Sequence, residues 1–195
     1  MSQSLLANLP NILTILRILL IPVLVVLLTN PGPAASLAAA LTFFLACWSD
    51  FFDGYLARRW ALSTTLGKLL DPLADKLIVA AALIMLAGMD RSPTVPAWMI
   101  AIIIGREIAV TGLRAVALGQ GVVVAAEELG KYKMIFQMFA LHGLLLHYHF
   151  LGVNFHVAGM YFLWISLAIS LWSGIDYHVK VIRQLLGGAA THAVS

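Results

Sequence analysis

The sequence predicts an all-α protein that crosses a membrane with six helices, and three observations lead to this fold class. Of 195 residues, 62% are hydrophobic and 11% are charged. Soluble domains are about 45–50% apolar and about 25% charged, so this chain has too few charges for a soluble surface. The apolar residues form continuous runs, unlike the alternating strands of a β-barrel, and turn residues separate the runs.

Each predicted helix is an apolar run close to the length of about 20 residues that a bilayer requires. The runs are residues 9–29, 35–59, 72–89, 95–118, 132–150 and 157–181. The first run contains Arg17 and Pro22 and no small-residue cleavage site follows it, so we interpret it as a retained helix, not a secretory signal. We expect a membrane domain over residues 1–186 and a flexible tail over residues 187–195.

The distribution of Lys and Arg predicts the orientation. If the N-terminus is inside, the outer loops hold only Arg91, and all other loop and flank cations lie inside. We therefore expect both termini in the cytoplasm. The formal net charge of +3 is small and gives no reason to expect a nucleic-acid partner. The inner cations are Arg58, Arg59, Lys68, Arg114, Lys131, Lys133, Lys180 and Arg183.

Ionisable residues inside the predicted helices lie in one layer. Each costs about 2.5–3.5 kcal/mol at a helix centre and therefore needs a partner, water or a metal ion. With a rise of about 1.5 Å per residue, Asp50 lies about 12 Å from the cytoplasmic end of its helix, and Arg17 and Arg106 lie at similar depths. This layer predicts a water-filled cavity that opens to the cytoplasm. Its other members are Asp53, Asp75, Lys76 and Glu107.

Four aspartates are spaced so that each pair shares a helical face. Asp50 and Asp53 are three residues apart, and Asp71 and Asp75 are four apart. Asp71 precedes Pro72, which predicts a helix that begins here, with Pro72 at its first position. Four close carboxylates need countercharge, and oxygen ligands select hard cations, so two Mg²⁺ or Mn²⁺ ions would balance them. A proton or ion relay is the alternative reading of an intramembrane aspartate.

The aspartates and the residues between them resemble the signature of the CDP-alcohol phosphotransferases, D-x2-D-G-x2-A-R-x8-G-x3-D-x3-D, at every fixed position from Asp50 to Asp75. The resemblance implies a six-helix homodimer in the bacterial inner membrane, with a cytoplasm-facing active site. It implies two metal ions on Asp50, Asp53, Asp71 and Asp75, and Asp75 as the general base. The residues implied to bind the CDP-linked lipid are Asn11, Thr14, Arg17, Gly54, Ala57, Arg58, Thr64 and Gly67.

Two further segments resemble family members that transfer a phosphatidyl group from CDP-diacylglycerol to sn-glycerol 3-phosphate. They begin at Gly105 and Gly130, and Met134 stands where those members often have Thr. The expected partners are thus these two substrates and membrane lipids. The residues implied to bind the acceptor phosphate are Arg106, Arg114, Lys131 and Lys133.

Three alternatives remain open from the sequence. The same chemistry could use inositol phosphate, serine, choline or phosphatidylglycerol as the acceptor. A cation or proton transporter would also carry intramembrane aspartates, although it would spread them across the membrane. Four histidines near the outer side could bind a metal ion, but we interpret them as solvated interfacial residues. They are His142, His147, His149 and His156.

Overall fold

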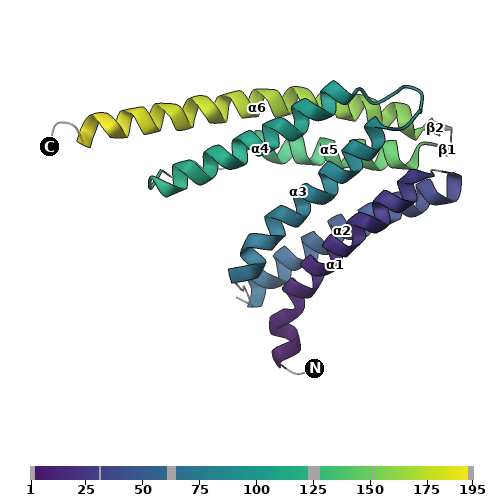
Figure 1. The fold of residues 1–195 in the computed structure, drawn as a ribbon, viewed down its shortest axis with the longest axis horizontal. Coiled ribbons are helices and arrows are strands. Elements are labelled where there is room, and N and C mark those ends of the chain that lie inside the picture. The colour runs from purple at the N-terminus through teal and green to yellow at the C-terminus, as the bar shows by residue number, and fades with distance from the viewer. Residues whose placement is uncertain (1–2, 31, 61–64, 123–127, 151, 193–195) are drawn as a thin grey trace.

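The computed structural model confirms the all-α prediction: its described part contains six helices and one short hairpin (Figure 1). The backbone is described for residues 3–30, 32–60, 65–122, 128–150 and 152–192, and the side chains for 12–30, 32–49, 70, 72–122, 129–149 and 152–185. The helices are α1 (Gln3–Thr29), α2 (Pro33–Trp60), α3 (Thr65–Ala87), α4 (Ala97–Gly119), α5 (Glu128–Leu146) and α6 (Phe155–His192). The hairpin consists of β1 (His149–Phe150) and β2 (Val153–Asn154), which pair antiparallel.

The predicted start of α3 was wrong. The helix begins at Thr65, and Pro72 lies inside it instead of at its first position. A proline removes one backbone hydrogen bond near its position, but flanking turns can continue the helix around it. The consequence is that Asp71 and Asp75 both lie on a continuous helix rather than at its entrance.

The predicted fifth helix was too long at its end, and one of the predicted solvated histidines is buried. α5 stops at Leu146, and His147 has a φ of 61° where the chain turns into the hairpin. His156 is only 1% exposed, so it is not a solvated interfacial residue. At the other end of the chain, α6 continues to His192. The boundary of the membrane domain at residue 186 stays a prediction.

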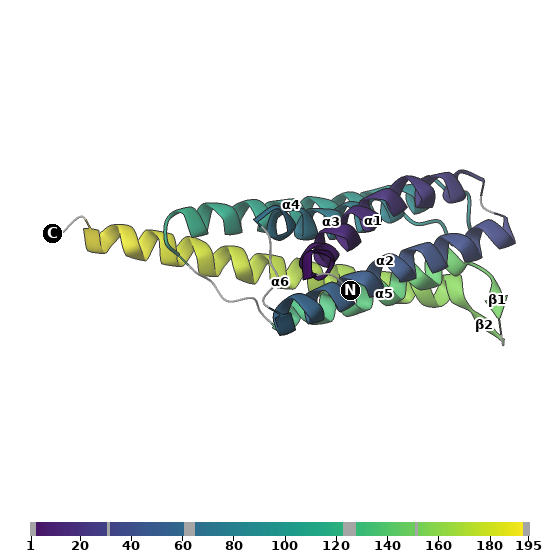
Figure 2. The same ribbon diagram turned by 90° about the horizontal axis from the view of Figure 1, so that it is seen from below.

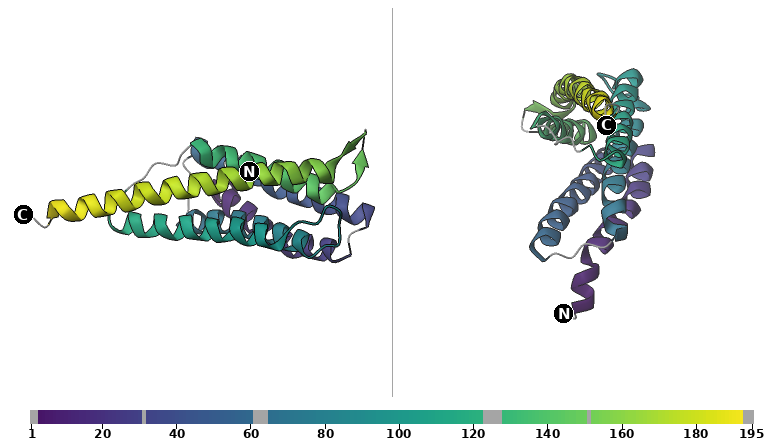
Figure 3. Two further views of the ribbon diagram at one scale, coloured as in Figure 1. Left: turned by 90° about the horizontal axis from the view of Figure 1, so that it is seen from above. Right: turned by 90° about the vertical axis from the view of Figure 1, so that its left-hand side faces the viewer.

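The helices run back and forth between two ends of an elongated bundle (Figures 1 and 2). We call one the hairpin end, where α1 ends at Thr29, α3 at Ala87 and α5 at Leu146. The other is the site end, where α2 ends and α3 begins. α1 packs against α2 and α3, while α6 packs against α4 and α5. The two groups of helices diverge toward the site end (Figures 1 and 3).

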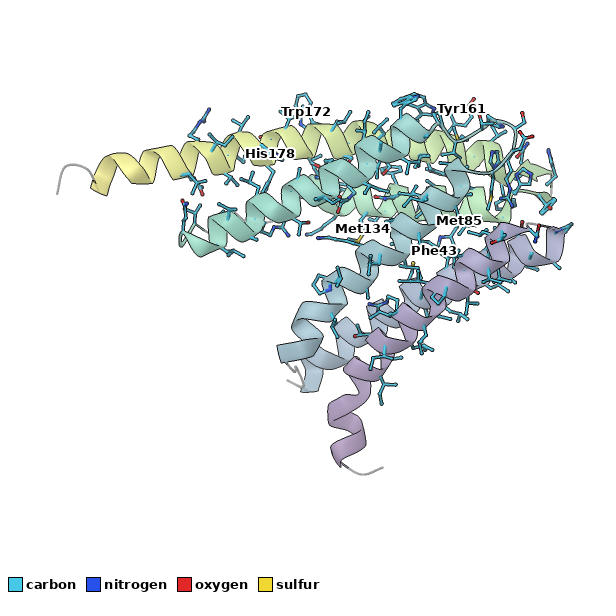
Figure 4. The ribbon with its side chains drawn as sticks, viewed as in Figure 1. Phe43, Met85, Met134, Tyr161, Trp172 and His178 are labelled. Carbon is cyan, nitrogen blue, oxygen red and sulfur yellow. The ribbon has the colours of Figure 1, made fainter. Side chains whose placement is uncertain are left out.

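The bundle is apolar both inside and outside. Leu24, Phe43 and Leu144 are fully buried, yet Val26 is 71% exposed and Trp172 is 70% exposed. Figure 4 shows Trp172 projecting away from the other helices. Two helices are long and apolar enough to cross a membrane by themselves, over Ile12–Thr29 and Phe155–Leu185. Large apolar side chains on the outside of such helices are typical of lipid-facing surfaces.

Two glycines lie where α5 and α6 cross closely. A Cβ atom at Gly143 would lie 2.7 Å from the Phe155 carbonyl oxygen and 2.9 Å from the Cα atom of Gly159. Both neighbours are backbone atoms, which cannot move aside as a flexible side chain can. Small residues therefore set the distance between these helices.

We expect Gly143→Ala to destabilise the protein by about 1–3 kcal/mol, because the added methyl group forces α5 and α6 apart. The measurement is the Tm of purified protein in detergent. Gly112→Ala is the matched control, since no atom outside its own helical surroundings lies within 4 Å of a Cβ built there. Equal Tm values for the two variants would contradict this account of the crossing.

Candidate active site

Helices α2 and α3 carry the four signature aspartates toward the site end. Asp50 and Asp53 lie in the last three turns of α2, and Asp71 and Asp75 lie in the first three turns of α3. The helical backbone confirms that each pair shares a face. Asp75 is the aspartate whose side chain is described. Nine predicted site residues lie outside the described residues or side chains. They are Asn11, Asp50, Asp53, Gly54, Ala57, Arg58, Thr64, Gly67 and Asp71.

Asp75 forms an ion pair with Arg17 of α1. The Arg17 Nη1 atom donates to Asp75 Oδ1 at 2.7 Å. Arg17 is 1% exposed, whereas the Asp75 side chain is 39% exposed. The guanidinium is therefore fixed inside the bundle, and the carboxylate it holds still reaches open space. An adjacent cation favours the ionised form of a carboxylate.

Arg17 also connects α1 to α2 beside Asp50. Its Nε atom donates to the carbonyl oxygen of Ala46 at 3.3 Å. Ala46 lies one helical turn before Asp50, so the two signature helices meet α1 at the same depth. Thr14, one turn before Arg17, is also buried, at 1% exposed. The sequence predicts that Arg17 and Thr14 contact the lipid nucleotide, but it does not reveal that Arg17 pairs with Asp75.

A second polar cluster surrounds Glu107 in the middle of α4. Its Oε1 atom accepts hydrogen bonds from Arg106 Nη1 at 2.6 Å and from Lys133 Nζ of α5. The Arg106 and Lys133 side chains are 14% and 8% exposed, respectively. Two of the four predicted acceptor-phosphate residues thus meet at one carboxylate. We refer to Arg106, Glu107 and Lys133 as the Glu107 cluster.

Arg106 ties this cluster to α6. Its Nε atom donates to the carbonyl oxygen of Ser170 at 3.0 Å, and its Nη2 atom donates to Ser173 Oγ at 2.6 Å. Gly174 makes room for the side chain, because a Cβ there would lie 3.1 Å from Arg106 Cγ and Nε. Three edges of the guanidinium are therefore held by α4 and α6, which fixes the charge in one position.

Lys76 of α3 was missing from the predicted site residues. Its Nζ atom donates to Thr111 Oγ1 at 2.5 Å, and Thr111 Oγ1 donates to the Glu107 carbonyl oxygen at 2.7 Å. The sequence signal was available, because a lysine inside an apolar helix needs a partner. Lys76 directly follows Asp75, so α3 presents the carboxylate toward α1 and the ammonium toward α4.

The other two predicted acceptor residues lie apart from the Glu107 cluster or at its edge. The Arg114 guanidinium carbon lies 5.5 Å from the centroid of the Tyr177 ring, about two turns along α4 from Glu107. This cation–π contact joins α4 to α6. Lys131 is exposed at the start of α5, two residues before Lys133.

The described geometry suits binding of a phosphate group near a carboxylate. Arg106 and Lys133 contact the carboxylate of Glu107, and Lys76 joins the same region through Thr111. A surplus of fixed donors in a partly buried place is typical of phosphate recognition. The neighbouring aspartates of α2 and α3 supply the oxygen atoms that hard divalent cations prefer.

The signature, the helical fold and this arrangement together define a class of protein: the chain belongs to the CDP-alcohol phosphatidyltransferase family, whose sequence profile matches residues 7–172. Among curated proteins it is 45% identical over 186 residues to the CDP-diacylglycerol–glycerol-3-phosphate 3-phosphatidyltransferase of Bacillus subtilis (strain 168), covering 89% of this chain and 94% of that protein.

Proteins of the same description in two other bacteria are also similar. The protein of Rickettsia typhi (strain ATCC VR-144 / Wilmington) is 40% identical over 171 residues, covering 87% of this chain and 94% of that protein. The protein of Haemophilus influenzae (strain ATCC 51907 / DSM 11121 / KW20 / Rd) is 38% identical over 175 residues, covering 87% of this chain and 91% of that protein. The similarity therefore extends over most of each chain and includes the whole signature.

Proposed function

We propose that this protein transfers the phosphatidyl group of CDP-diacylglycerol to sn-glycerol 3-phosphate, which gives phosphatidylglycerophosphate and CMP. One observation carries the choice of an acceptor that bears a phosphate: Asp75 and Lys76 are adjacent on α3, and Lys76 faces the Glu107 cluster. A base thus lies beside a set of phosphate-binding cations. The relatives' names support the same pair of substrates.

The proton and phosphate chemistry follows from the chain's own residues. Asp75 accepts the proton of the acceptor hydroxyl, whose oxygen forms a bond to the lipid-side phosphorus of CDP-diacylglycerol. The bond from that phosphorus to the CMP oxygen breaks, and CMP leaves. Arg17 holds the Asp75 carboxylate in place, and Lys76, Arg106 and Lys133 bind the acceptor's own phosphate. Positioning and electrostatics supply most of the rate in such transfers.

The family is generally dependent on a divalent metal, and the residues here fit that requirement. The donor set is composed of carboxylates, two on α2 and two on α3, and the contacts of Arg17 join both helices to α1 at one depth. Asp50, Asp53, Asp71 and Asp75 would hold two Mg²⁺ or Mn²⁺ ions. When bound, these ions supply countercharge for the pyrophosphate.

The membrane placement is part of the same proposal. Beyond the two apolar helices, α2, α3, α4 and α5 contain 28, 23, 23 and 19 residues. At about 1.5 Å per residue, each approaches or exceeds the hydrocarbon thickness of about 30 Å. We infer six spanning helices in the bacterial inner membrane, with both termini and the site end in the cytoplasm, and a homodimer as the working unit.

The deciding experiment is an assay of CMP release by purified protein in detergent. It supplies CDP-diacylglycerol, Mg²⁺ or Mn²⁺, and one acceptor at a time: sn-glycerol 3-phosphate, inositol phosphate, serine, choline or phosphatidylglycerol. We expect release with sn-glycerol 3-phosphate and its loss on chelation of the metal. Release with another acceptor alone would overturn the substrate, and no release with any acceptor would overturn the enzyme.

We expect Lys76→Met to raise the KM for sn-glycerol 3-phosphate by about ten- to a hundredfold, the effect of losing a hydrogen bond from a charged group. The KM for CDP-diacylglycerol should change little, because Lys76 faces the Glu107 cluster and not α2. Lys180→Met is the matched control, since Lys180 pairs with Asp176 on the exposed side of α6. Equal increases in the two KM values would count against this role.

A further inference from the structure

A cavity of about 540 Å³ lies at the hairpin end, opposite the candidate active site. The last turns of α1 and α3 and the turn after α5 form its walls. Its apolar wall includes Leu28, Ile84 and Met85, and its polar wall includes Arg91 and His147. Figure 4 shows Met85 where α3 approaches α1, at this end of the bundle. The catalytic proposal makes no use of the cavity.

Arg91 is a buried cation whose side-chain partners are neutral. It is 7% exposed, and its Nη1 and Nη2 atoms donate to the Leu144 carbonyl oxygen at 2.8 Å and to Ser36 Oγ at 2.7 Å. In the described part of the chain no carboxylate forms an ion pair with it. Burial lowers the pKa of Arg91, yet a guanidinium stays charged at neutral pH. Buried charges are normally paired, so the Arg91 guanidinium can accept an anionic partner in this cavity.

His147 adds an unused polar atom to the same wall. Its Nδ1 atom is buried and has no hydrogen-bond partner among the described residues. Its ring lies 4.8 Å from that of His156, whose Nε2 atom donates to the Pro93 carbonyl oxygen at 2.6 Å. Burial is the main cause that lowers the pKa of His147, and Arg91 and His156 add to it, which favours the neutral ring. A neutral imidazole can donate Nδ1–H to a bound anion.

The position and the lining indicate what kind of anion fits. The apolar stretch Ile12–Thr29 of α1 ends at the cavity, and the apolar stretch of α6 begins nearby at Phe155. The cavity is therefore at the depth where lipid head groups meet the hydrocarbon. Leu28 and Ile84 suit an acyl chain, and Arg91 suits a phosphate. The exposed Asp90 at the same cavity disfavours a ligand with a second negative charge.

We propose that this cavity binds a membrane phospholipid by its singly charged phosphodiester, with the phosphate on Arg91 and His147 and a chain along Leu28 and Ile84. Such a lipid supplies the countercharge that Arg91 lacks and the acceptor that His147 lacks. An amine in the head group, as in phosphatidylethanolamine, complements Asp90. The site is separate from the signature aspartates and does not depend on the acceptor that the active site uses.

The test is native mass spectrometry of delipidated protein in detergent, titrated with dioleoylphosphatidylethanolamine or with dioleoylglycerol, which has the same chains and no phosphate. We expect the phospholipid to bind about tenfold more tightly than dioleoylglycerol, which corresponds to about 1.4 kcal/mol. Arg91→Gln, which removes the charge and keeps an amide donor, should abolish that preference. His147→Asn, which tolerates the positive φ, should reduce it by about threefold.

Two control variants complete the test. Arg183→Gln removes a cation from the far part of α6, and His149→Asn changes an exposed histidine outside the cavity, so both should bind like the wild type. Because the active site also accepts lipids, the difference between Arg91→Gln and wild type is the readout. If Arg91→Gln fails to fold, His147→Asn and the wild-type comparison of the two lipids decide.

Three results would overturn the proposal. The first is equal binding of the two lipids by the wild type. The second is that both cavity variants prefer the phospholipid over dioleoylglycerol as strongly as the wild type does. The third is displacement of the phospholipid by an equal concentration of inorganic phosphate. The last result would make the cavity a phosphate site and not a lipid site. None of these three results concerns CMP release by the active site, so each would leave the proposed reaction standing.

Discussion

Asp75→Asn is expected to lower kcat for CMP release by about 10³-fold or more. General acid–base catalysis typically contributes about 10²- to 10⁴-fold to an enzymatic rate. The amide keeps the shape of the side chain but cannot accept the proton of the acceptor hydroxyl. Binding of CDP-diacylglycerol should largely survive, because the other three aspartates and Arg17 remain. The measurements are single-turnover CMP release and equilibrium binding of the lipid nucleotide.

The ion pair with Arg17 makes a stability control necessary. Asp75→Asn leaves a guanidinium that is 1% exposed without its described ion-pair partner, so Tm should also fall. Asp75→Glu retains a carboxylate and should recover part of the activity. Asp176→Asn removes a carboxylate from the exposed pair with Lys180 and should change neither kcat nor Tm appreciably. Normal turnover by a folded Asp75→Asn protein would exclude Asp75 as the base.

Glu107→Gln should destabilise the protein by about 3–5 kcal/mol, because it removes the carboxylate shared by two buried cations. Arg106 and Lys133 would then repel each other without a counterion. The 26% exposure of Glu107 admits some water and favours the lower part of this range. The measurement is Tm in detergent, with Asp176→Asn again as the control for an exposed ion pair.

The same variant separates a structural role of the Glu107 cluster from a role in substrate binding. If the cations bind the acceptor phosphate, added sn-glycerol 3-phosphate supplies the missing negative charge and should raise the Tm of Glu107→Gln more than that of the wild type. Dioleoylglycerol should have no such effect. A large loss of Tm that the acceptor does not restore would show that the cluster is structural only.

The existence and order of the helices could be predicted because apolar runs and turn residues are local properties. The predicted helix ends were wrong where the tertiary structure overrode a local sequence preference. Pro72 favours a helix start, but α3 begins at Thr65, and the helix as a whole packs against α1. The apolar run that ends α5 continues beyond His147, but the chain turns there with φ at 61°.

The candidate site also has features that the sequence predicts and features that only the structure reveals. The spacing of Asp71 and Asp75 places both on one face of any helix, so it could be read from the sequence. The pairing of Asp75 with Arg17, 58 residues away, could not, because spacing does not reveal which helices become neighbours. Nor could the sequence distinguish Arg106, held by α6, from Arg114, which lies over Tyr177.

By itself, the sequence determined that this is a helical, apolar protein with a carboxylate signature for transfer from a CDP-linked alcohol. Composition and spacing suffice for the helical, apolar fold and the carboxylate cluster, since they fix the solvent and the face of each helix, whereas the CDP-linked alcohol follows from the resemblance to the family signature. The tertiary structure alone decided which charges meet: Arg17 with Asp75, Glu107 with Arg106 and Lys133, and Lys76 with Thr111. It also left Arg91 buried at the hairpin end without a carboxylate partner in the described part of the chain. The physical reason is that a buried charge is stabilised by whatever the packing of distant segments brings within a few ångströms.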